Sequence, residues 1–294
     1  MHAEDETIAA RRSIGVGTLT NRFGSLARAA MTLLLLAAML PTTATSTAYA
    51  AKPSLCHAVA SLPAPIIYAS SALMPLQEDE ARISFIGHST FLIESAADVK
   101  IATDYNDYYR PSVLPDIVTM NRAHNTHYTN FPSPDIRHVL RGWNPDGGPA
   151  RHDVELRDVR VRNVPTNIRG WGGDAFNYGN SIFIFEMAGL CIGHLGHLQH
   201  TLTPQQVGDI GQLDIVLVAV DGGYTLDIDG IVEVLRNLRA RLVIPMHYFN
   251  SYTLNRFTER IAPHFPVEMA TDPTLVISRA TLPLEPRVLV LPGP

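Results

Sequence analysis

The sequence predicts a layered α/β sandwich for most of this 294-residue chain, and three observations support that fold class. First, 46% of the residues are apolar and 17% are charged, as in an ordinary folded domain. Second, short runs rich in Val, Ile, Phe and Thr, separated by turn residues, dominate the chain between residues 82 and 200. Third, similar runs alternate with helix-like segments after residue 200, and this mixture favours sheets and helices packed in layers.

Strands are expected first along the chain, because the early runs are enriched in branched residues and several alternate polar with apolar positions. The expected strands cover residues 82–87, 90–95, 99–104, 116–120 and 136–140, a hairpin over 153–164, and a pair at 180–187 and 190–193. The Gly and Pro content of residues 142–152 predicts a loop.

Helices enter after residue 200. Thr203 and Pro204 are typical of a helix start, with Gln206 inside the first turn. Two further helices are expected, and four more strands alternate with them: helices near 227–240 and 253–262, and strands at 214–220, 241–246, 274–278 and 287–291. No internal repeat and no linker divides this part of the sequence, so residues 81–294 are expected to form one domain.

The first fifty residues differ from the rest and have the features of a secretory signal peptide. Four arginines precede the apolar run "AAMTLLLLAAML" at 29–40, and small residues follow up to Ala50. A basic flank, a short apolar core and a small-residue cleavage site are typical of such a segment, and the run is short for a bilayer span. We expect a periplasmic or secreted protein, cleaved after Ala50, without a stable membrane span. The alternatives are an uncleaved anchor and a mis-assigned start codon.

The expected mature chain begins with an extension over residues 51–80, rich in Pro, Ala and Ser, that should lie along the surface. Residues 1–50 carry four basic and three acidic residues, so the mature charge is about −6. With no basic cluster, this charge argues against nucleic acid as a partner. A small-molecule substrate is the expected partner, and the oligomeric state is left open.

The chain contains two cysteines, Cys56 and Cys191, too few for a disulfide framework. One bridge is possible in an oxidising compartment. Because Cys191 lies in the apolar run "GLCIG", the sequence favours a buried free thiol.

Several histidines share one position, since each follows a strand-like run. They are His124, His127, His194, His197 and His247. Loops at strand ends commonly carry ligand-binding and catalytic groups, and imidazole is the commonest protein ligand for zinc. The pattern therefore predicts a metal centre, although any one of these residues alone could be an ordinary loop histidine.

The order of the motifs resembles the metallo-β-lactamase superfamily, especially its branch of metal-dependent hydrolases that includes ascorbate-6-phosphate lactonase. The matching motifs run from about residue 82 to at least 250: "ISFIGHSTFLIE", "IATD", "NRAHNTHYTN", "CIGHLGH", "DIVLVAVDGG" and "LVIPMHY". The resemblance implies a four-layer αββα sandwich over residues 81–294 and a metal-dependent hydrolase.

In that family the first metal motif reads H-x-H-x-D-H. This chain has Arg122, His124, Thr126 and His127 at the four ligand positions, so two of them are not ligands. A guanidinium has no lone pair to give, and the resemblance then implies an empty first metal site. Arg122, if it faces the cleft, would hold an anionic group of the substrate.

The next family motif reads H-x-G-D, and its aspartate bridges two metals. Here His194 and His197 stand at its ends, so an imidazole replaces the bridging carboxylate. The resemblance implies one zinc ion on His127, His197 and His247, with an open position for water. Sets that include His124 or His194, and a second ion, stay open, although two dications without a carboxylate are costly.

Four other residues are candidates near this site. His88, in "GHST", orients a ligand, contacts substrate or is a turn residue. Asp104 matches an aspartate that supports a ligand histidine, with turn capping as the alternative, and Asp221 is either a general base or a cap of the glycine turn. Tyr248 points into the cleft or packs below it.

These features predict an exported zinc-dependent hydrolase that activates water to cleave a small ester, lactone, amide or phosphodiester. The fold alone does not show which of these substrates is cleaved. Because two ligand positions and the bridging aspartate are lost, a non-catalytic periplasmic relative that binds a metal or small ligand is the alternative. The metal content of the purified mature protein distinguishes the two.

Overall fold

The computed structural model describes residues 54–57, 74–169 and 175–293. All of them belong to one of two compact units into which the chain divides, Lys52–Pro294. The signal peptide expected over residues 1–50 lies outside the described residues, as does most of the expected extension at 51–80. Within the described ranges, no helix has both the length and the apolar character needed to cross a membrane.

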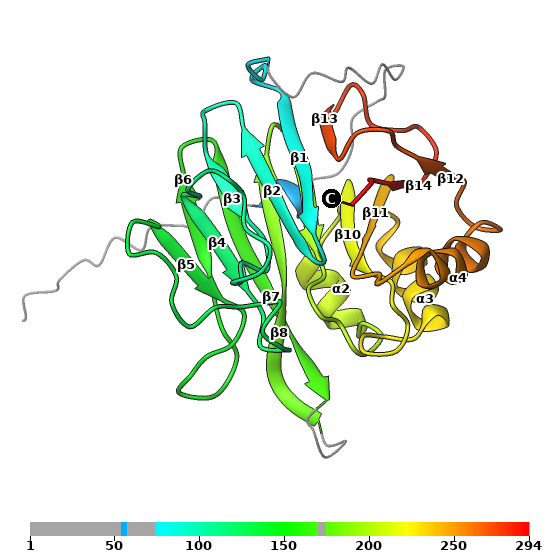
Figure 1. Cartoon of the computed structure of the whole chain (residues 1–294), viewed down its shortest axis with the longest axis horizontal. Helices are drawn as coiled ribbons and strands as arrows, with labels where there is room; N and C mark the ends of the chain where they lie inside the picture. The colour runs from blue at the N-terminus through cyan, green and yellow to red at the C-terminus, as the bar shows by residue number, and fades with distance from the viewer. Residues whose placement is uncertain (1–53, 58–73, 170–174, 294) are drawn as a thin grey trace, which may run out of the picture. The chain divides into compact units, whose positions relative to one another are not determined.

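Two β-sheets form the centre of this unit (Figure 1). The six-stranded sheet, in the order β13-β1-β2-β3-β4-β5, contains β1 (Glu80–Gly87), β2 (Thr90–Ser95), β3 (Lys100–Ala102), β4 (Ile117–Met120), β5 (His138–Arg141) and β13 (Thr274–Ser278). The eight-stranded sheet, in the order β12-β14-β11-β10-β9-β8-β7-β6, contains β6 (Asp153–Leu156), β7 (Val159–Arg169), β8 (Ala175–Met187), β9 (Leu190–His194), β10 (Ile215–Ala219), β11 (Leu242–Met246), β12 (Val267–Met269) and β14 (Arg287–Val290). Every strand expected from the sequence is present, and β12 is additional.

Three helices follow strands of the second sheet. They are α2 (Pro204–Ile210), α3 (Ile228–Leu238) and α4 (Ser251–Ile261). The side chains of Thr203 and Gln206 form the reciprocal bonds of a capping box at the start of α2, as the sequence predicts. Asp227 and Asn250 cap α3 and α4 by accepting backbone N–H bonds.

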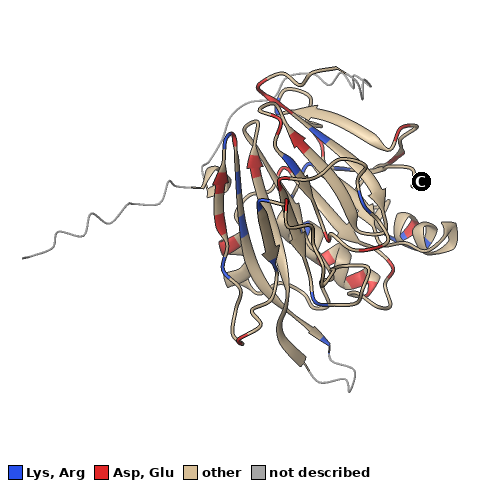
Figure 2. Cartoon of the chain, turned by 60° about the vertical axis from the view of Figure 1, so that its left-hand side comes forward, with Lys and Arg blue, Asp and Glu red and all other residues tan. Residues whose placement is uncertain are grey.

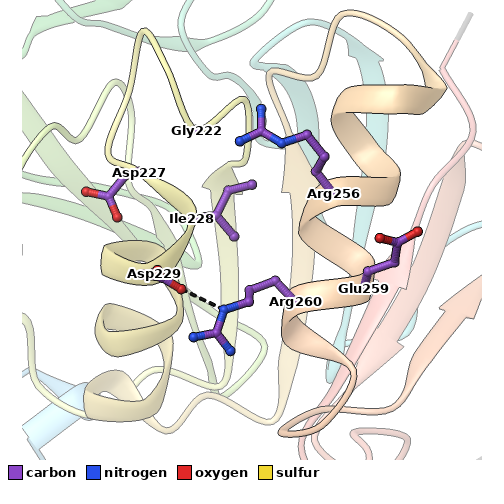
Figure 3. Close-up of a pocket in the computed structure, with 7 residues that line it drawn as sticks. All are labelled: Gly222, Asp227, Ile228, Asp229, Arg256, Glu259 and Arg260. Carbon is purple, nitrogen blue, oxygen red and sulfur yellow. Dashed lines mark hydrogen bonds and ion pairs between the residues drawn. The ribbon is translucent and has the colours of Figure 1, made fainter.

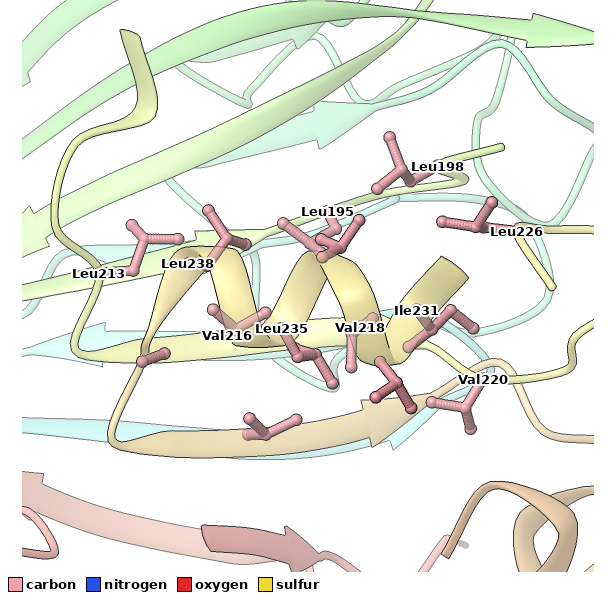
Figure 4. Packing of buried hydrophobic residues seen from close by; sticks show 14 of the residues in the cluster. Leu195, Leu198, Leu213, Val216, Val218, Val220, Leu226, Ile231, Leu235 and Leu238 are labelled. Carbon is pink, nitrogen blue, oxygen red and sulfur yellow. The ribbon is translucent and has the colours of Figure 1, made fainter. Parts of the chain in front are cut away.

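Two apolar layers hold the sheets and helices together. In β10, Ile215 and Leu217 point into the layer between the two sheets, whereas Val216 and Val218 point toward the helices. Figure 4 shows Leu235 of α3 over this second face of β10. Because both faces of β10 are covered, all five of its residues are buried, which explains its continuous apolar sequence.

The outer face of the six-stranded sheet is covered by loops within the described part of the chain. Ala102, Val118 and Met120 pack there against the loop residues Tyr105 and Ile136. The helices α2, α3 and α4 all contribute to the layer on the eight-stranded sheet. The two-sheet α/β architecture expected from the sequence is therefore confirmed, with its described helices on one side.

The two cysteines form a disulfide, so the free thiol favoured by the sequence is wrong. Cys56, in the short 3-10 helix η1 (Leu55–His57), is bonded to Cys191 of β9, and their Cα atoms are 5.8 Å apart. The local sequence could not show this pairing, because 135 positions separate the two residues. Ser54 and the backbone of Leu55 also donate hydrogen bonds to Glu186 in β8, so η1 is held firmly on the sheet.

Acidic and basic residues are interspersed over the strands, as Figure 2 shows. On β6, β7 and β8 they pair directly: Arg160 lies 2.7 Å from Asp153, and Arg162 lies 2.9 Å from Glu186. The Arg160–Asp153 pair is exposed and contributes at most about 1 kcal/mol, whereas Glu186 is buried. Both signs of charge thus lie side by side on this surface.

Candidate metal centre

Histidine side chains from four strand-end loops meet in one cluster. They are His88 after β1, His124 and His127 after β4, His197 after β9, and His247 after β11. The ring centroid of His127 lies 4.4 Å from that of His124, 4.8 Å from His197, 5.1 Å from His247 and 5.2 Å from His88. We call these five residues the histidine cluster.

The buried carboxylate of Asp104 contacts Nδ1 of His127. Nδ1 of His127 lies 2.6 Å from Oδ2 of Asp104 and 3.1 Å from Oγ of Ser89. Asp104 also accepts a hydrogen bond from Nδ2 of Asn121 at 3.0 Å. Burial raises the pKa of Asp104 well above its usual value, against the opposing effect of its hydrogen bonds. A buried carboxylate of this kind gains most from a nearby cation.

His247 has a second carboxylate behind it. Nδ1 of His247 lies 3.0 Å from Oδ2 of Asp221, within ion-pair distance although not aligned as a hydrogen bond. Asp221 accepts the backbone N–H groups of Gly223 and Tyr224 at 2.8 and 2.6 Å and the hydroxyl of Thr225 at 2.6 Å. Burial raises the pKa of Asp221, but His247 and these hydrogen bonds outweigh it and lower that pKa below its usual value. Asp221 therefore stays ionised.

Two imidazole nitrogens face each other at the centre of the cluster. Nε2 of His127 lies 3.1 Å from Nε2 of His247. If each Nδ1–H faces its carboxylate, both Nε2 atoms carry lone pairs and cannot bond each other. Two nitrogen ligands of a tetrahedral zinc ion, with bonds of about 2.0–2.1 Å, lie about 3.3 Å apart. The pair therefore fits a shared metal ion.

Four members of the cluster bring their nitrogens within metal-binding range. One ring nitrogen from each of His88, His124, His127 and His247 lies within 4.8 Å of the others. Nε2 of His88 is buried without a hydrogen-bond partner. The backbone N–H of His247 donates to the carbonyl of His88 at 2.7 Å, which ties the two loops together.

The remaining contacts of the cluster come from polar neighbours. Nδ1 of His197 lies 3.0 Å from Nε2 of Gln199, and Nε2 of His197 is buried without a partner. The backbone N–H of His197 donates to Asn180 at 2.8 Å. Thr126, at the position where the resemblance expects aspartate, contacts Nδ1 of His124 at 2.7 Å, so it supports a neighbouring histidine.

Four imidazoles of the cluster are kept neutral, those of His88, His124, His127 and His197. Burial, followed by repulsion from neighbouring histidines, lowers the pKa of His88 to about 3 and that of His124 to about 4. The same two causes hold the pKa values of His127 and His197 well below 6.5. Neutral imidazole is the form that binds a metal ion.

His194, a candidate ligand from the sequence, is not part of the cluster. It is fully buried, and both of its ring nitrogens are engaged. Nδ1 accepts the N–H of Gly196 at 3.2 Å, and Nε2 donates to the carbonyl of Ser89 at 2.9 Å. The residue therefore links β9 to the turn between β1 and β2.

Arg122 and Tyr248 also point elsewhere. Arg122 is exposed, and its guanidinium carbon lies 4.8 Å from the ring centroid of Phe176. The hydroxyl of Tyr248 donates to the carbonyl of Leu291 at 3.1 Å, and its ring packs on the apolar layers. Of the two arrangements expected for Tyr248, the structure has the one below the cleft.

An open pocket of about 540 Å³ lies against the histidine cluster. His124 and His197 form part of its wall, whereas the other three histidines do not. The rest of the wall consists of Ala123, Asn125, Ile168, Arg169, Gln199, Tyr224 and Phe249. The ring of Phe249 lies 5.4 Å from that of His247 and 5.8 Å from that of Tyr224, so an exposed aromatic pair stands beside the cluster.

Another cavity, of about 480 Å³, opens between α3 and α4 (Figure 3). Acidic residues of α3 and its cap face basic residues of α4, and Arg260 pairs with Asp229 at 2.6 Å. No histidine lines this cavity. It therefore lacks the metal chemistry of the histidine cluster.

Several residues that shape the centre were not candidates from the sequence. Gln199, Asn121 and Ser89 each contact a histidine or a supporting carboxylate, and Phe249 and Tyr224 line the pocket. Their only local signal is position, since each lies within three residues of a predicted site residue. Their side-chain directions depend on the folded loops.

Comparison with known proteins identifies related sequences and a structure of the same fold. The model of the beta-lactamase superfamily domain matches residues 82–247. A UPF0173 metal-dependent hydrolase from Thermoplasma volcanium is 34% identical over 194 residues, which cover 58% of this chain and 84% of the relative. One from Nanoarchaeum equitans is 24% identical over 185 residues, 57% of this chain and 83% of the relative. A solved structure from Thermotoga maritima, assigned to the zinc-dependent hydrolases of the metallo-β-lactamase superfamily, has a TM-score of 0.54 and 28% identity and covers 73% of this chain and 100% of its own.

Proposed function

This chain belongs to the metallo-β-lactamase superfamily of metal-dependent hydrolases, and we propose that it is an exported enzyme that uses one zinc ion to cleave a small ester, lactone, amide or phosphodiester. The observation that carries the proposal is the 3.1 Å separation of Nε2 of His127 and Nε2 of His247. Both rings turn Nδ1 toward a carboxylate. With the protons on Nδ1, a cation between the two Nε2 atoms offsets the repulsion of their lone pairs. A third imidazole of the cluster completes the ligand set.

The charges favour one ion over two. Among the described residues, Asp104 and Asp221 are the carboxylates in contact with the cluster, at 2.6 Å from His127 and 3.0 Å from His247. Together they balance one dication. A second dication would leave an uncompensated charge of about +2 beside neutral imidazoles, which is unfavourable in a site of low dielectric.

The metal, the two carboxylates and the pocket have different roles in the proposed hydrolysis. When bound, the metal lowers the pKa of coordinated water and polarises the oxygen of the scissile group. Asp104 and Asp221 orient the two ligand histidines. Asp221 is a poor general base, because its oxygens already accept hydrogen bonds from the turn and its pKa is lowered. The pocket beside His124 and His197 holds the substrate.

Export is supported by the disulfide. Bonds such as Cys56–Cys191 form and persist in the periplasm and outside the cell, and they are rare in the cytosol. The expected signal peptide over residues 1–50 agrees with this compartment. Fractionation of cells that produce the full chain, with sequencing of the mature N-terminus, tests it, and an intact, cytosolic chain would contradict export.

The function itself is tested by metal analysis combined with a substrate panel. The panel contains 4-nitrophenyl acetate, γ-butyrolactone and bis(4-nitrophenyl) phosphate. We expect about one zinc per chain and hydrolysis of at least one of the three, with both lost in His127→Ala and His247→Ala. His138→Ala, in β5, is the matched control. A folded wild-type protein that takes up no zinc would refute the proposal.

A further inference from the structure

We propose that His88 is the third metal ligand and that His197 instead donates a hydrogen bond to the substrate. The inference rests on the proposed one-metal hydrolase and replaces His197, the third ligand expected from the sequence. It follows from which ring nitrogen of each histidine can carry a lone pair toward the centre of the cluster.

Gln199 determines the tautomer of His197. The side-chain oxygen of Gln199 accepts the backbone N–H of Arg169, and its Nε2 donates to the carbonyl of Tyr224 at 2.8 Å. These two backbone groups orient the amide, so its second N–H faces Nδ1 of His197, 3.0 Å away. Nδ1 is then an acceptor, and neutral His197 carries its proton on Nε2. A protonated Nε2 has no lone pair for a metal.

His127 and His247 have the opposite arrangement. Each turns Nδ1 toward a carboxylate, at 2.6 Å from Asp104 and 3.0 Å from Asp221. An ionised carboxylate accepts and never donates, so the hydrogen bond to Asp104 holds the proton of His127 on Nδ1. Asp221 is within ion-pair distance of Nδ1 of His247, although not aligned as a hydrogen bond, and favours the same tautomer there. The lone pairs are then on the two Nε2 atoms. The groups that contact Nδ1 therefore distinguish the three histidines: His127 and His247 can bind a metal through Nε2, whereas His197 can donate a hydrogen bond from Nε2.

His88 has the properties of the missing ligand. Its ring centroid is 4.0 Å from that of His247, its Nε2 is buried without a partner, and one of its nitrogens belongs to the group within 4.8 Å. His88 and His247 also have positive φ angles, 54° and 56°, a conformation that costs residues with a Cβ about 1–2 kcal/mol. Such strain is retained where it positions a functional group.

The pocket shows from which side substrate reaches the metal centre. His197 lines the pocket, whereas His88, His127 and His247 do not. A metal held by these three would be reached by substrate from the pocket, the side on which His197 lies. Nε2 of His197 is itself buried without a partner. Its N–H would therefore donate only to an oxygen that enters from the pocket as far as the metal, where negative charge develops during hydrolysis.

Zinc binding to the full metal-free chain tests the ligand assignment. The variants are His88→Asn and His197→Ala, because asparagine tolerates the left-handed backbone of position 88 and lacks an imidazole. We expect His88→Asn to weaken zinc binding by more than about 100-fold, since losing a partner of a ligand alone costs 10–100-fold. His197→Ala should change the affinity by less than about threefold. X-ray absorption of the zinc-loaded wild type should show three imidazole ligands, which does not depend on how any variant folds.

Acetate binding to the zinc-loaded protein tests the donor role. His197→Ala should weaken acetate binding about tenfold, and His197→Gln, which keeps an N–H donor, should restore most of it. Zinc binding that is unchanged in His88→Asn, or lost in His197→Ala, would overturn the ligand assignment while leaving the hydrolase proposal intact. Equal acetate affinity in wild type and His197→Ala would overturn the donor role. A wild-type protein that binds no zinc would overturn both proposals.

Discussion

Oδ2 of Asp104 lies 2.6 Å from Nδ1 of His127, and both side chains are completely buried. The contact sets the tautomer of His127 and turns its Nε2 toward His247. A carboxylate that burial alone destabilises is thus placed where a bound cation offsets its cost. The metal and the buried acid are expected to stabilise each other.

Replacing Asp104 with asparagine should separate metal binding from folding. We expect Asp104→Asn to weaken zinc binding about 10–100-fold, because the support of a ligand histidine is lost. The metal-free variant should unfold at a urea concentration no lower than that of the metal-free wild type, because burial raises the pKa of Asp104 and disfavours its charge in the folded state. Asp98→Asn, which removes an exposed carboxylate, is the control. Unchanged zinc affinity would contradict this account.

The stability of the metal-free protein should decrease below pH 6.5. Burial lowers the pKa of His194 to about 4 in the folded state, so between these values the unfolded chain binds a proton that the folded chain does not. The free energy of unfolding then falls by about 1.4 kcal/mol per pH unit for this residue. Urea unfolding at pH 7, 6 and 5 measures it. The raised pKa of Asp104 has the opposite effect on the pH dependence, but it is the same in wild type and in His194→Gln. The free energy of unfolding of His194→Gln should therefore change less with pH than that of the wild type. Equal pH dependence in the two proteins would exclude this role of His194.

The disulfide should stabilise the fold measurably. Cys56–Cys191 joins η1 to β9 across 135 positions, and a bridge that closes a long loop typically adds about 2–4 kcal/mol. Dithiothreitol should therefore lower the free energy of unfolding by this amount. The double variant Cys56→Ala, Cys191→Ala is the control, because it has no cysteine left to reduce. If reduction does not shift the unfolding curve of the wild type, residues 54–57 contribute little to stability.

The sequence predicts the strands and the histidine cluster better than the contacts around them. His124, His127 and His247 follow apolar strands, and local pattern alone places them at the edge of the sheets. The cysteine pair, in contrast, depends on two distant segments meeting. The same holds for Gln199, whose hydrogen bonds to Arg169, the last residue of β7, and to Tyr224 exist only once these distant segments are folded. These bonds decide what His197 can do.

The aromatic side of the pocket should affect substrate affinity more than turnover. Phe249 is 55% exposed and lines the pocket next to the ring of Tyr224. We expect Phe249→Ala to raise KM for 4-nitrophenyl esters about three- to tenfold with little change in kcat, since an aromatic contact contributes about 0.5–1.5 kcal/mol. Tyr252→Ala is the control, because Tyr252 is 71% exposed on α4 and does not line the pocket. Equal KM values for wild type and Phe249→Ala would exclude this role.

A change at Gln199 should convert His197 from a donor into a ligand. In Gln199→Glu a carboxylate replaces the amide that donates to Nδ1 of His197 at 3.0 Å. An ionised carboxylate only accepts, so the proton of His197 moves to Nδ1 and its Nε2 gains a lone pair toward the cluster. Zinc affinity should then rise about tenfold, and X-ray absorption should show one additional imidazole. Gln199→Leu, which removes both donor and acceptor, should leave the affinity within about threefold of the wild type. If both variants bind zinc alike, the partner of Nδ1 does not decide the role of His197.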